Sequence, residues 1–206
     1  MPFDHVVRTP DELYETYAAP ADGVRTKSVA SFDEHCRTYI SLSPFVLMAT
    51  TDAEGNCDVS PRGGVPGFVT VIDDTRLAIP DASGNNRLDS LRNVVQSGRI
   101  GLLFVIPGMA ETLRVNGRAC ISTDPDLVAR HVLQGKPPKA VIGVDLDEAF
   151  LHCAKAFMRS DLWDPASWPD RSGLARPAQI WKDHIGMPDP IEEVETWLAD
   201  DYANNL

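Results

Sequence analysis

The sequence predicts an α+β fold in which an antiparallel β-barrel is flanked by helices. Four short β-leaning runs joined by turn residues occupy residues 45–80, and longer strand patterns follow at residues 100–106, 112–121 and 139–146. Helical patterns stand before, between and after these strands. Segregated strands with helices at their sides favour a barrel over a parallel sheet of alternating strands and helices.

Two helices are predicted before the first strand. Thr9, Pro10 and Glu12 fit a capping box with proline at the first helical position. A loop follows, and a second helix then carries an apolar face. That face holds Phe32, Cys36, Tyr39 and Ile40.

The four short strands are predicted to form an antiparallel meander. The first is Phe45 to Thr51, and residues 52–55 supply the turn after it. Residues 56–61, 68–72 and 76–80 give the other three, with a glycine- and proline-rich break before residue 68. Tight turns between all four indicate that neighbours in the chain are neighbours in the sheet.

A helix and two longer strands follow this region. Asn86 is expected to cap the helix at its N-terminus and Gly98 at its C-terminus. Residues 100–106 are almost wholly apolar, which predicts a central strand. Residues 112–121 alternate with a period of two and leave one polar face.

The last third of the chain is predicted to contain a short helix at Asp124, the last strand and a helix over residues 148–159. A proline- and tryptophan-rich stretch then follows, whose aromatic side chains favour burial against the barrel or a partner subunit. A final helix begins near Asp189. We therefore divide one overall domain into a helical extension (1–43), a barrel core (44–160) and a C-terminal wrap (161–206).

Charge and hydropathy exclude several classes of function. The 206 residues carry a net charge of −11, which argues against nucleic-acid binding because phosphate backbones bind clustered lysine and arginine. No apolar run is long enough to span a membrane, and the first ten residues lack the layout of a signal peptide. We expect a cytoplasmic protein. A small anionic ligand stays compatible with this charge, since it needs only a few local cations.

The four cysteines indicate neither a metal site nor a disulfide framework. Cys36, Cys57, Cys120 and Cys153 lie far apart, without the close pairs of zinc or redox motifs. Most lie in strongly patterned segments, so we expect buried thiols. The sequence also lacks the Walker loop, the dinucleotide-binding glycine motif, the serine nucleophile elbow and the zinc-protease motif.

Two segments are candidates for binding an anionic or flat ligand. The loop from Asp81 to Arg87 ends at a predicted helix N-terminus, where free amides attract anions, although this segment taken alone favours an ordinary capping loop with a solvated arginine. Residues 58–64 place Ser60 and Arg62 before two glycines that permit close approach to a flat ligand. A proline-broken strand end is the alternative.

Two further segments carry rows of cations. Arg114 and Arg118 alternate with Asn116 on the polar face of one strand, which is also typical of a solvated barrel surface. On the predicted helix 148–159, His152, Lys155 and Arg159 share one stripe that would attract a phosphate or an acidic partner. Pairing with surface carboxylates is the alternative.

Taken in order, these segments resemble the FMN-binding core of the pyridoxamine 5′-phosphate oxidase-like superfamily. The resemblance rests on Ser60-Pro-Arg62-Gly63, on Ala78-Ile-Pro80-Asp81 leading to Gly84-Asn85-Asn86-Arg87, and on Leu113-Arg-Val-Asn-Gly117. It extends to the bacterial branch with a His-Cys-x-Lys-Ala segment, which here begins at His152. It implies a split β-barrel homodimer with one FMN in each of two interface clefts.

The resemblance also implies a set of FMN-binding residues. They are Asn86 and Arg87 at the phosphate, Ser60, Arg62 and Gly63 on one strand, Pro80 and Asp81 on the next, Thr112 and Arg114 on a third, and Lys155, Arg159 and Ser160 reaching the cofactor of the opposite subunit. The substrate signature of the oxidase itself is not found in matching form. The resemblance thus implies the fold and the cofactor, not pyridoxamine phosphate oxidation.

Three hypotheses about function follow. The leading one is an FMN-dependent oxidoreductase acting on a small molecule, with no side chain identified as catalytic. The second is a non-catalytic FMN carrier or sensor. The third is binding of deazaflavin or haem on the same fold.

Overall fold

The computed structural model describes residues 3–82, 84–133 and 135–204. The strands are β1 (Phe45–Thr51), β2 (Cys57–Gly63), β3 (Thr70–Val71), β4 (Arg76–Pro80), β5 (Arg99–Val105), β6 (Thr112–Ser122) and β7 (Val141–His152). The helices are α1 (Pro10–Thr16), α2 (Asp22–Thr26), α3 (Glu34–Leu42), α4 (Asp89–Ser97), α5 (Pro125–Ala129), α6 (Lys155–Arg159), α7 (Pro177–Ile185) and α8 (Ile191–Asn204), with a 3₁₀ turn at Pro165–Ser167.

The seven strands form one antiparallel sheet in the order β2-β1-β5-β6-β7-β4-β3. The α+β prediction is therefore confirmed, and the sheet is of the split-barrel type. Its two edge strands are β2 and β3, each paired on one side alone. The predicted meander is wrong. β1 pairs with β2 and β3 with β4, but the chain crosses from one edge of the sheet to the other between the two hairpins.

A tight turn after β2 starts this crossing. Gly64 lies so close to Phe68 that an added Cβ would be 2.8 Å from Phe68 Cβ. The segment that looked like a simple hairpin connection is instead packed inward, because Phe68 and Val69 are both buried in the core. Burial of these two side chains decides the path of the chain, and local turn chemistry does not reveal it.

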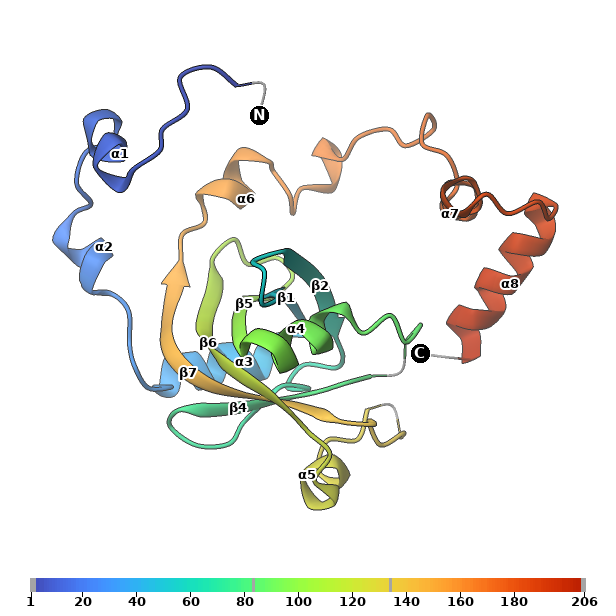
Figure 1. Ribbon diagram of the computed structural model, residues 1–206, viewed down its shortest axis with the longest axis horizontal. Helices are drawn as coiled ribbons and strands as arrows, with labels where there is room; N and C mark the ends of the chain where they lie inside the picture. The colour runs from blue at the N-terminus through green and yellow to red at the C-terminus, as the bar shows by residue number, and fades with distance from the viewer. Residues whose placement is uncertain (1–2, 83, 134, 205–206) are drawn as a thin grey trace.

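The core lies on the concave side of the sheet and is covered by α3. Residues at alternate positions of β1, β5 and β6 point into it, as Val46, Met48, Leu102 and Val115 do. The predicted apolar face of α3 packs on the same core with Cys36, Tyr39 and Ile40. Figure 1 shows α3 and α4 against the sheet. β5 is an interior strand, as predicted, and lies between β1 and β6.

The last strand is longer than predicted, and the helix expected over residues 148–159 is wrong. β7 continues to His152, because Ala149, Phe150 and Leu151 pair with β6 through Arg114 and its neighbours. Only Lys155–Arg159 is helical, as α6. His152, Lys155 and Arg159 therefore do not share a helical stripe. The short helix α2 was not predicted either.

Buried thiols were expected, but the environments of the cysteines differ. Cys36 is buried, whereas Cys57, Cys120 and Cys153 are exposed, and all four are free. Among the described residues, no cluster of three or more histidine, cysteine or acidic side chains is arranged to hold a metal ion.

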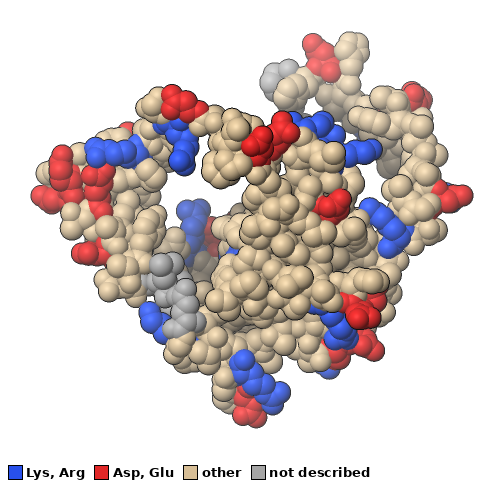
Figure 2. All heavy atoms as spheres, turned by 180° about the vertical axis from the view of Figure 1, so that it is seen from behind, with Lys and Arg blue, Asp and Glu red and all other residues tan. Residues whose placement is uncertain are grey.

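The C-terminal arm (residues 161–204) extends away from the barrel (Figure 1). Trp163 Nε1 donates to Met109 O at 2.9 Å, and Trp181 stacks on Trp197 at 5.1 Å. Trp168 is 59% exposed, and Figure 2 shows open gaps between the barrel and the terminal segments. The arm does not cover its own barrel closely. None of the described helices is long and apolar enough to span a membrane.

Candidate functional site

A pocket of about 720 Å³ opens where the two ends of the sheet approach each other. Its walls come from β2, the end of β4, the loop and first turn of α4, and the residues before β7. The lining includes Ser60, Pro61, Arg62, Gly63, Phe68, Pro80, Asp81, Asn85, Asn86, Arg87, Leu88, Asp89, Ser90, Leu91, Thr123 and Lys139. β2 and β4 are separated by four strands in the sheet, so a shared pocket requires the sheet to curve back on itself.

The N-terminus of α4 faces this pocket without a side-chain cap. Its N-cap is Leu88 in the left-handed region, with φ of 59°, and no side chain accepts a hydrogen bond from the first turn. The prediction that Asn86 caps this helix is therefore wrong. The amides of Asp89, Ser90 and Leu91 cannot be satisfied within the helix, because the first N–H groups of any α-helix lack a carbonyl partner. Such an end attracts anions.

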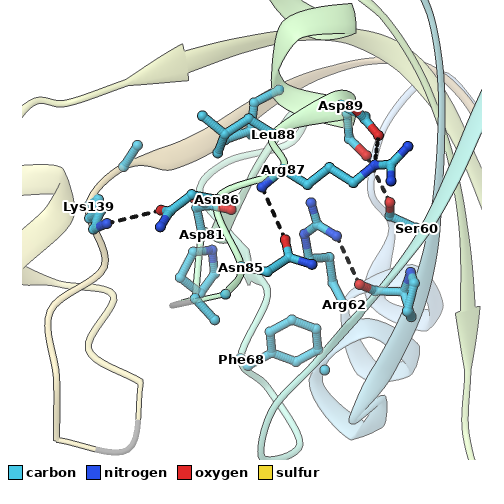
Figure 3. Close-up of a pocket in the computed structure, with 18 of the residues that line it drawn as sticks. Ser60, Arg62, Phe68, Asp81, Asn85, Asn86, Arg87, Leu88, Asp89 and Lys139 are labelled. Atoms are coloured by element: carbon cyan, nitrogen blue, oxygen red, sulfur yellow. Dashed lines mark hydrogen bonds and ion pairs between the residues drawn. The ribbon is translucent and has the colours of Figure 1, made fainter. Parts of the chain in front are cut away.

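The loop before α4 is held in a strained conformation. Asn86 and Leu88 both have positive φ, of 56° and 59°. A bulky residue in this region is uncommon and costs energy, and such strain concentrates at binding sites. The Asn85 side chain accepts from the Arg87 amide at 3.0 Å, and the Asn86 side chain accepts from Lys139 Nζ at 3.3 Å (Figure 3). Ser83, which the sequence places in this loop, lies outside the described residues.

Arg87 is the cation nearest the helix end. Its guanidinium forms an ion pair with Asp89, and this pairing raises the pKa of Arg87. The side chain is 79% exposed, so it is accessible to a ligand in the pocket. The negative charge of Asp58 also raises the pKa of Arg87, by a smaller amount.

Asp81 lies on the opposite wall, between two cations. Burial raises the pKa of its carboxyl, while the positive charges of Arg62 and Lys139 oppose that shift. Lys139 was not a predicted site residue. It reaches Asp81 because β4 pairs with β7, with Pro80 opposite Val141, and this pairing is not visible in the sequence.

A hydrogen-bonded cluster joins β2 to α4 at the back of the pocket. Ser90 Oγ donates to Asp58 Oδ2 at 2.5 Å, and Ser60 Oγ bonds the same carboxylate oxygen at 3.2 Å. The hydroxyl oxygens of Ser90 and Ser60 lie 3.0 Å apart, within hydrogen-bonding distance. Ser90 is buried, and neither it nor Asp58 was predicted, because their proximity depends on how α4 packs on β2.

The comparison with known families decides what this chain is related to. A family model described as pyridoxamine 5′-phosphate oxidase matches residues 32–153, which is more than half of the chain. The chain belongs to this family. The matched region runs from just before α3 to just beyond the end of β7, and it contains every pocket residue named above. No curated protein matches the chain.

Solved structures of three other proteins are similar to part of this chain. Group A Streptococcus HupZ is 20% identical, with 58% of this chain and 92% of that chain covered and a TM-score of 0.49. A putative pyridoxamine 5′-phosphate oxidase from Lactobacillus delbrueckii is 22% identical, with 59% and 95% covered and a TM-score of 0.47. An F420 reductase is 18% identical, with 55% and 94% covered and a TM-score of 0.40.

The pyridoxamine 5′-phosphate oxidase family has a flavin-binding fold, and part of the implied FMN site lies together in the pocket. The residues that line it are Ser60, Arg62, Gly63, Pro80, Asp81, Asn86 and Arg87. Thr112, Arg114, Lys155, Arg159 and Ser160 are not among the lining residues. Thr112 is buried on β6, and Ser160 Oγ donates to Ala156 O at the end of α6.

Proposed function

We propose that the pocket binds FMN and that the protein is an FMN-dependent oxidoreductase acting on a small molecule. The observation that carries this proposal is the uncapped N-terminus of α4, with Arg87 beside it, at one end of a pocket of about 720 Å³. A phosphate monoester fits such a helix end, and the volume is within the range of cofactor pockets.

The donors present match the two halves of FMN. Amides of the first turn of α4, Arg87 and Lys139 would hold the phosphate, since each donates a hydrogen bond and two carry positive charge. On β2, Ser60 and Arg62 would bind the polar edge of the ring, and Gly63 leaves room for a flat group. The end of β4, with Pro80 and Asp81, forms the opposite wall.

The flavin supplies the redox chemistry, transferring a hydride or electrons to or from a small molecule. The chain's own residues bind and orient it. The Asp58 carboxylate holds the Ser60 and Ser90 hydroxyls in fixed positions, which keeps Ser60 aimed along one wall of the pocket. No side chain is assigned as an acid or base.

Members of this family commonly form dimers with the flavin at the interface, and we propose such a homodimer here. Leu47 pairs with Pro61 on one side and with Leu103 on the other, and residues paired in this way lie on the same face of the sheet. This outer face carries further apolar side chains, including Val59, which is 60% exposed. A second copy would cover it.

The C-terminal arm supports the same proposal. Its exposed apolar side chains include Leu174 and Trp197, and burial against a second copy would remove them from water. Lys155, Arg159 and Ser160 lie in α6 and at its end, directly before this arm, and we propose that they contact the flavin of the second copy. We also keep the division into residues 1–43, 44–160 and 161–206 as a proposal.

The test of the cofactor is the absorption spectrum of freshly purified protein, followed by titration with FMN and with riboflavin. We expect a flavin spectrum and tight binding of FMN. Riboflavin, which lacks the phosphate, should bind much more weakly. A colourless protein that does not bind added FMN would overturn the proposal. Release of F420 on denaturation would show that the bound cofactor is F420 and not FMN.

A separate experiment distinguishes an enzyme from a carrier. The FMN-loaded protein is mixed anaerobically with NADH or NADPH and compared with photoreduced protein. Reduction by one nucleotide faster than by free FMN supports the oxidoreductase. Photoreduction without any reaction with either nucleotide, followed by failure to reduce small-molecule acceptors, favours the carrier.

A further inference from the structure

A carboxylate stands behind one wall of the pocket. Asp58 precedes Ser60 by two positions on β2, so the two side chains lie on the same face of the sheet. Ser60 pairs with Met48, whose side chain is in the core, and this face is therefore opposite to the one proposed for the second copy. Ser60 and Ser90 line the pocket, whereas Asp58 is not among the lining residues.

Asp58, Ser60 and Ser90 form a closed triangle of oxygen atoms. Ser90 Oγ lies 2.5 Å from Asp58 Oδ2, Ser60 Oγ lies 3.2 Å from the same atom, and the two hydroxyl oxygens are 3.0 Å apart. A carboxylate only accepts hydrogen bonds, and each serine hydroxyl has one proton to donate. Two protons therefore serve three contacts, and their positions can be deduced.

The Ser90 proton belongs to the shortest contact. Two oxygen atoms 2.5 Å apart repel each other unless a proton lies between them, and this distance is typical of a hydroxyl that donates to a carboxylate. Ser90 is 3% exposed, so water does not compete for the bond. Ser90 therefore donates to Asp58 and turns a lone pair toward Ser60.

The Ser60 proton then has two favourable positions, both within the triangle. It points at the Asp58 carboxylate or at the lone pair of Ser90. A proton turned toward the pocket would leave the Ser60 oxygen facing two other oxygens with no proton between them, one of them negatively charged, and these atoms repel each other. In both favourable positions Ser60 presents lone pairs, and no proton, to the pocket.

We propose that Asp58 is a positioning residue that makes Ser60 a hydrogen-bond acceptor, so that the ligand presents an N–H or O–H group at this point of the pocket. The identity of that ligand rests on the proposed function. FMN has such donors at the ring N–H between its two carbonyl groups and at its ribityl hydroxyls, whereas its ionised phosphate has acceptors alone. Arg62, two residues further along β2, can only donate. The two side chains would thus offer one acceptor and one donor to the ligand.

Titration with FMN and with riboflavin at pH 8, followed by flavin fluorescence, tests which part of the ligand Ser60 binds. Ser60→Ala should weaken the binding of both about fivefold, the usual effect of one lost hydrogen bond, because the donor lies outside the phosphate. A loss for FMN alone, or for neither ligand, would overturn the proposal. 3-Methyl-FMN lacks the ring N–H and separates the two donors. Equal binding to Ser60→Ala and to the unmodified protein identifies the ring N–H, and a loss equal to that of FMN identifies a ribityl hydroxyl.

A double-mutant cycle tests the role of Asp58. Asp58→Ala should weaken riboflavin binding about threefold and have no further effect in Ser60→Ala, since Asp58 acts through Ser60. Riboflavin is the probe because the charge of Asp58 also acts on Arg87, which is proposed to bind the phosphate. Glu54→Ala, which removes an exposed carboxylate from the turn before β2, is the matched control and should leave the affinity unchanged. Equal losses in both backgrounds would show that Asp58 only supports the fold.

A measurement on the ligand-free protein separates a failure of this inference from a failure of the proposed function. With ¹³C-labelled serine, NMR detects hydroxyl protons that exchange slowly with water. We expect such signals from Ser60 and Ser90, and faster exchange of the Ser60 proton in Asp58→Ala. Absence of the Ser60 signal from the unmodified protein would overturn the deduced proton positions. A protein that shows both signals but binds neither riboflavin nor FMN would refute the proposed function and leave Ser60 an acceptor for a different ligand.

Discussion

Lys139 Nζ lies 3.3 Å from Asn86 Oδ1 and ties the residues before β7 to the loop that leads into α4. Asn86 has a left-handed backbone conformation, and the next residue, Arg87, lines the pocket. A residue 53 positions away in the chain thus contacts the loop of the proposed phosphate site.

Replacing Arg87 by alanine should weaken FMN binding roughly tenfold to a hundredfold, because a charge-assisted hydrogen bond to the phosphate is lost. Fluorescence titration measures the affinity. Riboflavin should bind Arg87→Ala and the unmodified protein equally, since it has no phosphate. Arg92→Ala is the matched control, as Arg92 is an exposed arginine on α4 and does not line the pocket. Equal FMN affinity in Arg87→Ala would refute the phosphate assignment.

Leu88→Gly should stabilise the free protein by about 1 kcal/mol, because glycine adopts the left-handed region without the steric cost of a leucine. Leu88 has φ of 59° and is 48% exposed, so little burial is lost. Urea denaturation gives the free energy of unfolding. Val95→Gly, in the regular and exposed part of α4, should instead lower it by about 0.5 kcal/mol. A loss of stability in Leu88→Gly would show that the strain is absent.

Gly117→Ala should destabilise the protein by about 3 kcal/mol or more, because the new Cβ would collide with the backbone. An added Cβ at Gly117 would lie 2.1 Å from Asp145 O, at the point where the pairing of β6 and β7 shifts register. At Gly101 on the neighbouring strand the nearest atom would be Asn116 Oδ1 at 3.4 Å. Thermal unfolding of Gly101→Ala should therefore differ little from that of the unmodified protein.

Asp81→Asn should raise the stability of the cofactor-free protein at neutral pH. Burial raises the pKa of Asp81 in the folded state, so the folded protein holds this proton more tightly than the unfolded chain. The free energy of unfolding therefore falls as the pH rises from 3.8, the pKa of this carboxyl in the unfolded chain, through its higher pKa in the folded protein. It stays lower at every pH above that. The stabilisation by Asn should disappear in acid. A gain that is independent of pH would contradict this assignment.

A maleimide reagent should label three thiols in the native protein and four after denaturation, as counted by mass spectrometry. Burial, reinforced by Asp33, raises the pKa of Cys36 to about 11, so its reactive thiolate is scarce at neutral pH. Cys57, Cys120 and Cys153 are exposed. Rapid labelling of Cys36 in the native state would show that α3 does not pack as described.

Elements bounded by clear turn residues could be predicted from the sequence. The strands Phe45–Thr51 and Arg76–Pro80 have the predicted bounds, because aspartate, glycine or proline residues stand at or beside their ends. Thr9 caps α1 as expected, accepting from the Glu12 amide at 3.3 Å. These are local signals, and local signals can be read along the chain.

Features that depend on distant pairing could not be predicted. Phe150, Leu151 and Ala154 have a spacing that also fits a helix, but pairing with β6 makes the first two part of a strand. The crossing between β2 and β3 depends on burial of Phe68. In the site, Lys139, Asp58 and Ser90 come together only through the packing of strands and helix, so no motif identifies them.

β2 and β4 stand at nearly opposite ends of the sheet order, and no backbone hydrogen bonds join them. A molecule held by Ser60 on β2 and by Asp81, directly after β4, would link the two strands across this gap. Its departure would loosen β2 and β4 together, so slower hydrogen exchange in both strands on ligand binding would accompany a higher melting temperature. The ligand in the pocket would then stabilise the barrel as well as take part in the reaction.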